Sequence, residues 1–263
     1  MHIRTNPALN KIFQPLIYFC EWLGEHHPIV LAEIRYYARF KKKLNLKNPQ
    51  TLNEKILYLS LKTDTTLWTR CADKYAVRGY VEEKGLKDIL IPLIGVWDNV
   101  EDVDFDKLPK EFVIKANHGS GDVVIVKDKA KLDWKSTVRY FHEDLNHKYG
   151  ALESAHHYLR IQPKLMNFGE SNSLVDYKMW CFNGKCQYIM TCSHRKVTNG
   201  HETVVLKVYD RDWVNHPDYM VYDNDHVVGN DVLKPTNLYE MIDIAERLSK
   251  DFPCVRVDLY NVG

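Results

Sequence analysis

The segment FVIKANHGSGDVVIVK, residues 112–127, decides how this chain folds. Its two apolar arms, residues 112–114 and 123–126, flank a small polar turn with glycines, which predicts a β-hairpin. Glycine tolerates positive φ, and successive free N–H groups in such a turn form a concavity that suits phosphate. Lys115 ends the first arm, where its ammonium group could contact the same phosphates. An ordinary hairpin with Lys115 and Lys127 as solvated charges is the alternative interpretation.

The composition is that of a globular protein with one large domain or two modest ones. The 263 residues are 45% apolar and 27% charged, values that are normal for a chain that buries a core. Thirty-six basic and 35 acidic residues give a net charge of +1, so no overall field attracts the protein to nucleic acid or to an acidic membrane. We therefore expect no nucleic-acid partner, and we interpret the run Lys41-Lys42-Lys43 as a solvated helix end.

The sequence contains no segment that we expect to cross a membrane. Residues 12–23 are apolar, but they include a proline and polar residues, are too short for a bilayer and lack a small-residue cleavage site. Six cysteines occur without a Cys-x-x-Cys pair, and we interpret Cys181, Cys186 and Cys192 as buried free thiols rather than metal ligands. These features predict a cytoplasmic protein that can rest against the inner face of a membrane.

The N-terminal part of the chain has a helical pattern. Residues 1–62 contain one expected helix over residues 29–40, and a second helix through residue 61 begins after Thr51. Thr51 is followed three residues later by Glu54, the spacing of a capping box. We therefore interpret Glu54 as a helix cap rather than as a catalytic group.

A further helical region is expected over residues 64–84, before a short edge strand within residues 89–96. In a continuous helix, Asp73, Lys74 and Arg78 would share one edge. A surface charge cluster is compatible with this spacing. The strand contains proline and glycine, which favours an edge position.

The C-terminal half is expected to be rich in strands. Asn183-Gly184 between two β-prone runs is the strongest hairpin signal of the sequence. The predicted elements after the first hairpin are a helix over 134–149, strands over 174–180, 187–191 and 204–209, a helix over 238–248 and a strand over 255–261. Strand alternation places Asp176 and Lys178 on one face, and likewise Arg256 and Asp258. Such a face suits a cleft wall or a plain solvent face.

Five short motifs occur in a fixed order along the chain. They are Asn48-Pro49-x-Thr51-x-Asn53-Glu54-Lys55, Asp73-Lys74-Tyr75-x-Val77-Arg78, Leu108-Pro109-x-x-Phe112-Val113-x-Lys115-x-Asn117-His118-Gly119-Ser120-Gly121, Asp176-Tyr177-Lys178-x-x-Cys181-Phe182-Asn183-Gly184 and Arg256-Val257-Asp258-Leu259-Tyr260. Together they resemble the ATP-grasp superfamily and most closely its TupA-like branch, named for teichuronopeptide biosynthesis. The resemblance implies an α+β fold in which two α+β subdomains grasp Mg-ATP. We expect a helical N-terminal region with a short edge strand over residues 1–107 and a nucleotide-binding region over 108–263, with subdomains at about 108–162 and 163–263.

The resemblance also implies roles for individual residues. Lys74 and Lys115 would approach the nucleotide phosphates, Asp258 would be the first carboxylate of the magnesium site, and Arg195 and Arg256 would hold the transferred phosphoryl group or an acyl-phosphate. The remaining cofactor-binding candidates are the turn residues Asn117, His118, Gly119, Ser120 and Gly121, together with Lys127, Asp176 and Lys178. A planar guanidinium suits bidentate recognition of phosphate or carboxylate.

The chemistry implied by the resemblance is ATP-dependent joining of a carboxylate to an amine through an acyl-phosphate. The branch is associated with capsular or cell-wall polysaccharide synthesis, so the expected substrates are a uronic acid and an amino acid, with peripheral association with polysaccharide machinery. A glycosyltransferase-like enzyme of the same processes is the first alternative. For it, Asp223-Asn224-Asp225 is the nearest candidate motif, although a turn explains that motif better.

Two departures from the family pattern favour a second alternative, a degenerate nucleotide-binding member without catalysis. The hinge before Asp176 lacks the expected Glu, for which Glu170 is a candidate substitute. The sequence ends at Gly263, five residues after Asp258, before the strand that would carry the second magnesium carboxylate. A truncated chain would explain the second departure equally well.

Overall fold

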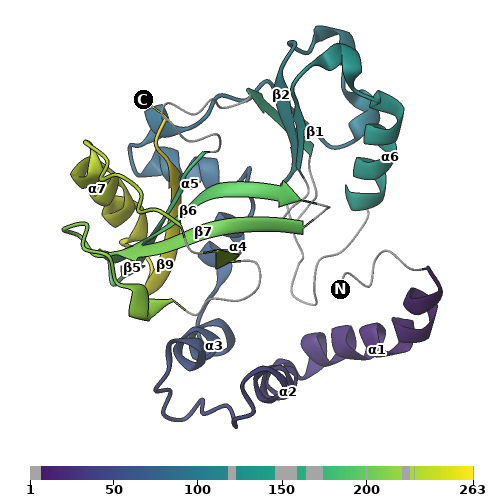
Figure 1. Ribbon diagram of the computed structural model, residues 1–263. Coiled ribbons are helices and arrows are strands. Elements are labelled where there is room, and N and C mark those ends of the chain that lie inside the picture. The colour runs from purple at the N-terminus through teal and green to yellow at the C-terminus, as the bar shows by residue number, and fades with distance from the viewer. Residues whose placement is uncertain are drawn as a thin grey trace. The chain divides into compact units, whose positions relative to one another are not determined.

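The computed structural model describes residues 7–117, 123–145, 159–163, 174–198, 201–220, 226–227 and 229–262 (Figure 1). Its contacts divide the chain into two compact units. The first unit contains Met1–Tyr80 and Ile91–Pro163, and the second contains Val81–Leu90 and Lys164–Gly263. Short 3₁₀ helices cover Lys87–Ile89, Val100–Asp102, Phe105–Lys107, Lys129–Lys131 and Pro217–Tyr219. The subdomain boundary expected near residue 162 stays a prediction.

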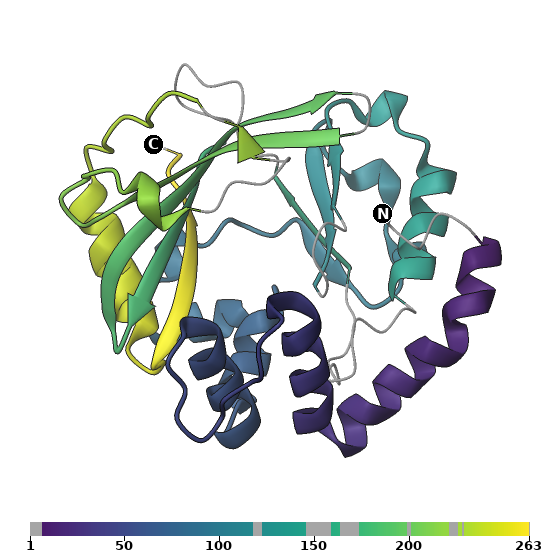
Figure 2. The same cartoon turned by 60° about the horizontal axis from the view of Figure 1, so that its bottom comes forward.

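The first unit begins with helices, as the sequence predicts. They are α1 (Pro7–His26), α2 (Pro28–Phe40) and α3 (Leu52–Lys62), and Figure 2 shows α1 leading into α2. In the described part of the chain, no helix is long and apolar enough to cross a bilayer.

The predicted capping box at the start of α3 is confirmed. The Thr51 hydroxyl accepts a hydrogen bond from the Glu54 N–H at 3.3 Å, and the Glu54 carboxylate accepts one from the Thr51 N–H at 2.9 Å. The same carboxylate accepts a bond from the Gln50 N–H at 2.9 Å. These backbone donors of Thr51 and Gln50 lower the pKa of Glu54. Glu54 therefore acts as the cap that the sequence indicates.

The helical region expected over residues 64–84 is confirmed, but it consists of two short helices. They are α4 (Thr66–Ala72) and α5 (Val77–Glu83). Asp73 between them has extended backbone geometry, and its carboxylate accepts hydrogen bonds from the N–H groups of Tyr75 at 2.7 Å and Ala76 at 2.9 Å. A short Asp side chain that binds nearby backbone competes with helix continuation. The single helix edge expected for Asp73, Lys74 and Arg78 therefore does not exist.

The first unit is completed by an antiparallel sheet of four strands in the order β1-β4-β2-β3. The strands are β1 (Gly95–Trp97), β2 (Phe112–Ala116), β3 (Val123–Val126) and β4 (Leu159–Pro163), and the helix α6 (Trp134–Leu145) also belongs to this unit. The predicted hairpin is confirmed as β2 and β3, and the predicted edge strand is β1, shorter than expected. Phe112, Ile114 and Ala116 form the core of this unit with Phe141 of α6.

The second unit contains a sheet of five strands in the order β8-β7-β6-β5-β9. They are β5 (Asp176–Phe182), β6 (Lys185–Thr198), β7 (His201–Tyr209), β8 (His226–Val227) and β9 (Cys254–Tyr260). All neighbours are antiparallel except β7 and β8. The turn between β5 and β6 places Asn183 at φ 48° and Gly184 at φ 73°, the left-handed geometry that an Asn-Gly hairpin requires.

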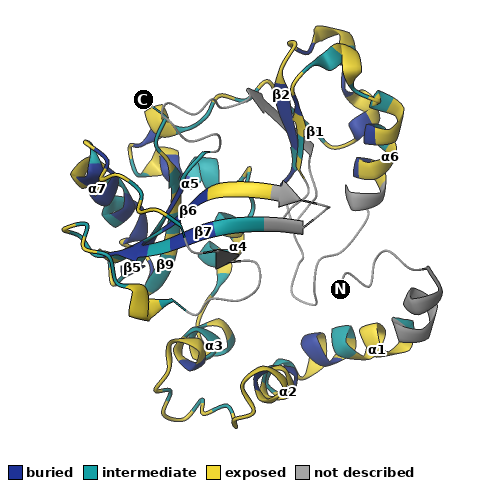
Figure 3. Cartoon of the chain, in the orientation of Figure 1, coloured by how far each residue is buried: buried dark blue, intermediate teal, exposed yellow. Residues whose placement is uncertain are grey.

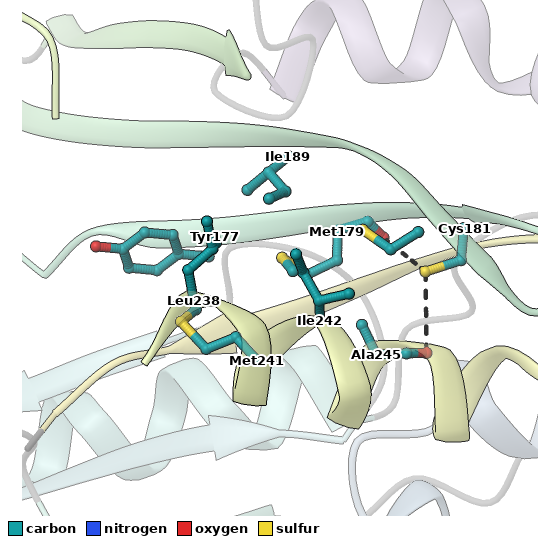
Figure 4. Packing of buried hydrophobic residues seen from close by; sticks show 9 residues of the cluster. Tyr177, Met179, Cys181, Ile189, Leu238, Met241, Ile242 and Ala245 are labelled. Carbon is teal, nitrogen blue, oxygen red and sulfur yellow. Dashed lines mark hydrogen bonds between the residues drawn. The ribbon is translucent and has the colours of Figure 1, made fainter. Parts of the chain in front are cut away.

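One face of this sheet is covered by α7 (Leu238–Ser249) (Figure 2). Tyr177, Met179 and Cys181 of β5 point from alternate positions into a core with Leu238 and Ile242 of α7 (Figure 4). Since side chains alternate along a strand, the residues between these core positions lie on the opposite face. The burial of β5 on one side therefore fixes which of its polar groups stay together on the other.

Candidate functional site

The end of β2 is held by a buried polar network within the first unit. Asn117 is completely buried, and its Nδ2 donates a hydrogen bond to Asp73 Oδ2 at 2.7 Å. The Lys74 N–H donates to the Asn117 carbonyl at 3.0 Å, and Lys74 Nζ donates to the Ala116 carbonyl at 3.3 Å. Asp73, Lys74 and Asn117, which we call the Asp73 network, thus fix the backbone at the point where the turn begins.

Lys115 lies on the face of β2 that points away from the core. Phe112, Ile114 and Ala116 are buried in the core cluster, whereas Lys115 is half-buried on the other side. Its backbone pairs with Val123 on β3 and with Arg160 on β4. The pairing of the Lys115 backbone with that of Arg160 depends on sheet register, which the sequence does not indicate. The predicted site residues His118, Gly119, Ser120 and Gly121 lie outside the described residues.

Lys127 lies away from this end of the hairpin. Lys115 pairs with Val123 at the turn, whereas Lys127 is exposed and follows Val126, which pairs with Phe112 at the opposite end. Four strand residues separate the two positions, about 13 Å at 3.3 Å per residue. The structure thus brings Lys74 and Asn117 together at the end of the strand that carries Lys115. It does not join Lys127 to them, and the role expected for Lys127 stays a prediction.

The second unit carries a group of charged side chains on the face of the sheet opposite α7. We call Asp176, Lys178, Arg195, Arg256 and Asp258 the charged face. The register places Lys178 of β5 directly opposite Asp258 of β9. Lys178 Nζ lies 3.1 Å from Asp258 Oδ2 and 3.8 Å from Asp176 Oδ2. One ammonium group therefore links both carboxylates.

Arg256 binds Asp258 through two hydrogen bonds. Its Nε lies 2.7 Å from Asp258 Oδ1, and a terminal nitrogen of the guanidinium lies 2.9 Å from Asp258 Oδ2. The hydrogen bond to Asp258 raises the pKa of Arg256, and the guanidinium lies 5.9 Å from the ring centre of Trp180. A two-point pair of this kind fixes both side chains in one orientation.

Arg195 reaches the charged face because β6 is irregular at that point. The register between β6 and β7 shifts between Ser193 and Lys196, and His194 has a φ of 52°. Arg195 pairs with Asp176 through a hydrogen bond to Oδ2. An extra residue in a strand re-aims the side chains around it, which a sequence pattern of alternation does not reveal.

Two further side chains of this face were not expected from the sequence. Tyr260 pairs with Asp176 in the register of β9 and β5, and Cys192 pairs with Asp176 from β6. Burial, together with the Asp176 carboxylate, raises the pKa of Tyr260, and burial also raises the pKa of the Cys192 thiol. Strand alternation could have identified Tyr260, because it lies two residues after Asp258 and therefore on the same face of the strand.

The charged face contains donors that fit a magnesium ion together with phosphate. Asp258 keeps 42% of its side chain exposed, and Asp176 keeps 11%. Magnesium is usually bound through one or two carboxylates plus phosphate oxygens, which matches an accessible Asp258 with Asp176 beside it. Among the residues that the structure describes, no group of three or more His, Cys, Asp or Glu side chains forms a metal site.

Comparison with known families gives one match over most of the chain. A family described as TupA-like ATPgrasp matches residues 54–263. No curated protein matches the chain.

Solved structures give weaker likenesses. The ATP-grasp ligase PsnB, complexed with a minimal precursor, matches with 9% identity and a TM-score of 0.42, over 79% of this chain and 54% of its own. The D-alanine–D-alanine ligase from Bacillus anthracis matches with 20% identity and a TM-score of 0.41, over 73% of this chain and 53% of its own. The chain thus spans about half the length of these structures.

Proposed function

Because the chain belongs to the TupA-like ATP-grasp family, we propose that it is an ATP-dependent carboxylate–amine ligase. In the proposed reaction, a carboxylate oxygen takes the γ-phosphoryl group of ATP, and ADP leaves. The amine then attacks the acyl carbon of the acyl-phosphate, the carbon–oxygen bond to phosphate breaks, and the amine loses a proton. An amide, ADP and phosphate result. This reaction depends mainly on positioning and charge neutralisation.

The observation that carries the proposal is the charged face. Lys178 and Arg256 both contact Asp258, and Arg195 contacts Asp176, all on the side of the sheet that α7 leaves uncovered. A rigid sheet with a packed core behind it holds these groups in fixed positions. Fixed charges that need no rearrangement stabilise a transition state better than mobile ones.

We assign Asp258, with Asp176 beside it, to the magnesium ion, which would neutralise charge on the phosphates when bound. Arg256 lies beside Asp258 on the same face. We assign its guanidinium to the binding of an anionic group, for which its planar fork is suited. Arg195 is assigned to the same task, the binding of the phosphoryl group or the acyl-phosphate.

In the first unit we assign Lys115, Lys74 and the turn that starts at Asn117 to the nucleotide phosphates. The Asp73 network supports this assignment because it fixes the backbone from which the turn begins. Lys74 already donates to the Ala116 carbonyl, so its role would be to position the strand end as well as to add positive charge.

The substrates that we propose are a uronic acid of a surface polysaccharide and an amino acid, in the cytoplasm where ATP is available. This choice extends the family resemblance to this chain, and it is the part of the proposal that a substrate screen tests directly. Release of ADP should require both a carboxylate and an amine from the panel.

The first experiment is calorimetric titration of the chain with ATP, with and without magnesium. We expect magnesium-dependent binding in the wild type, a loss of about 100-fold or more in Lys115→Ala, and no change in the control variant Lys135→Ala on the exposed side of α6. Binding by a folded chain without any ADP release in the screen would indicate the non-catalytic member. No binding by a folded wild-type chain would contradict the proposal.

A further inference from the structure

The N-terminal helix α1 exposes apolar side chains on more than one side. Residues 15–19 are all exposed, and Tyr18 and Phe19 keep 60% and 53% of their surface accessible. Figure 3 shows exposed positions along both α1 and α2. A surface helix of a globular protein normally turns its apolar residues towards the core, so this segment needs another explanation.

Aromatic side chains form a stripe along one side of α1. Tyr18 and Trp22 are four residues apart, so they lie one turn apart on the same side of the helix. The rings of Phe19 and Trp22 are stacked with centres 6.1 Å apart, and Trp22 stacks on His26 at 5.1 Å. Aromatic residues with a polar edge are typical of the boundary between lipid and water.

The next helix, α2, has a second apolar stripe that ends in basic residues. Val30, Ile34 and Tyr37 are exposed at intervals of four and three residues, which places them on one side of the helix. Leu31 and Tyr36 are buried on the other side. The helix ends at Phe40, and Lys41-Lys42-Lys43, all of which are exposed, follow directly in the chain.

The charge of this region differs from that of the chain as a whole. From residue 1 to residue 43 the sequence has seven Lys and Arg residues and three acidic residues, although the whole chain has a net charge of +1. The small net charge of the whole chain is therefore the sum of a basic N-terminal region and an acidic remainder. An anionic lipid surface attracts a basic segment by about 1 kcal/mol for each Lys or Arg near it.

We propose that α1, α2 and the lysine cluster Lys41-Lys42-Lys43 form a docking surface for an anionic lipid bilayer. The two helices lie in the plane of the membrane interface, with the aromatic stripe inserted among the headgroups and the lysines against the anionic phosphates. This arrangement uses both the exposed apolar side chains and the basic excess. A second copy of this chain would bring the same basic excess against itself, so charge complementarity favours the bilayer.

The test is co-sedimentation of the full-length chain with vesicles of pure phosphatidylcholine and of phosphatidylcholine with phosphatidylglycerol. We expect binding to the anionic vesicles that weakens as salt is raised, and at least tenfold weaker binding to the neutral ones. Failure of the folded chain to bind anionic vesicles would overturn the proposal.

Two variants separate the apolar and the basic contributions. Phe19→Ser with Trp22→Ser should lower binding by about 100-fold, because two aromatic side chains are no longer transferred from water into the bilayer interface. Lys41→Gln with Lys42→Gln and Lys43→Gln should lower binding to anionic vesicles by about 100-fold and leave the weak binding to neutral vesicles unchanged.

The matched control is Leu233→Ser, which removes a side chain that is 88% exposed outside these helices and should bind as the wild type does. Circular dichroism verifies that each variant is folded. Sedimentation velocity tests the alternative that a second copy covers the helices. The bilayer proposal is wrong if the wild type forms a dimer that the Phe19→Ser, Trp22→Ser variant loses and if the wild type does not bind vesicles.

Discussion

The two units present their polar groups in opposite ways. The Asp73 network is built around a completely buried Asn117 and consists of hydrogen bonds that mostly involve backbone atoms. The charged face consists of ion pairs between side chains, and Asp258 and Arg256 are each 42% exposed. Buried polar groups are costly to leave without partners, whereas exposed ion pairs contribute little to stability. The first arrangement is therefore suited to holding a strand end, and the second to exchanging partners with a ligand.

The largest expected effect concerns the charged face of the second unit. Asp258→Asn should lower magnesium-dependent ATP turnover by about 100- to 1,000-fold, because it removes the accessible carboxylate assigned to the cation. The free energy of unfolding should change by less than about 1 kcal/mol, since the pair with Arg256 is exposed. Initial rates of ADP release and urea unfolding measure the two quantities.

The control for this variant is Asp243→Asn, which removes a carboxylate that lies 3.9 Å from Arg247 and is 69% exposed. Its turnover should equal that of the wild type. Equal losses in both variants would mean that general surface charge, rather than the site at Asp258, supports the activity.

The second-largest expected effect concerns the Asp73 network of the first unit. Asn117→Ala should lower the free energy of unfolding by about 2 kcal/mol, because the completely buried Asn117 amide is removed and Asp73 Oδ2 loses its hydrogen-bond donor. Asn99→Ala removes a similar bond, Nδ2 to Asp102 Oδ2 at 3.2 Å, from an exposed position, and it should cost less than about 0.5 kcal/mol. Urea titrations measure the loss of unfolding free energy in each variant. Similar losses would show that burial does not distinguish the Asn117 bond from the Asn99 bond.

The smallest effect is a pH dependence of the charged face. Burial and Asp176 raise the pKa of Tyr260 above that of an unfolded chain, where tyrosine titrates near about 10. The neutral phenol is thus favoured in the folded state, so its contribution is fully present below about pH 10 and is lost as the pH rises further. Tyr260→Phe should make the unfolding free energy less steep between about pH 10 and 11. An unchanged slope would show that Tyr260 does not contribute.

Local features of the fold could be predicted because they depend on neighbours in the sequence. The capping box of Thr51 and Glu54, the hairpin of β2 and β3 and the Asn183-Gly184 turn are all confirmed, since each needs only a few adjacent residues. The break between α4 and α5 was missed because Asp73 binds the backbone of Tyr75 and Ala76. Helical periodicity does not report such competition.

Part of the candidate site could be predicted, because it depends on the spacing of residues along a single strand. Alternation along β5 and β9 correctly put Asp176 with Lys178 and Arg256 with Asp258, because side chains two residues apart share a face. The irregular register that aims Arg195 at Asp176, and the pairing of Tyr260 with Asp176, depend on which strands lie side by side. Those contacts are separated by many residues in the sequence, so no local pattern carries them.

The sequence by itself determined the element types, the turns and the family, because these depend on spacing and on short motifs. Only the tertiary structure decided that β5 lies between β6 and β9, and that Lys178 therefore lies between two carboxylates. It also decided that Tyr18 and Phe19 of α1 and Ile34 of α2 stay exposed, which composition alone does not reveal. The physical reason is that strand order and burial are set by contacts between distant segments, whose packing involves the whole core.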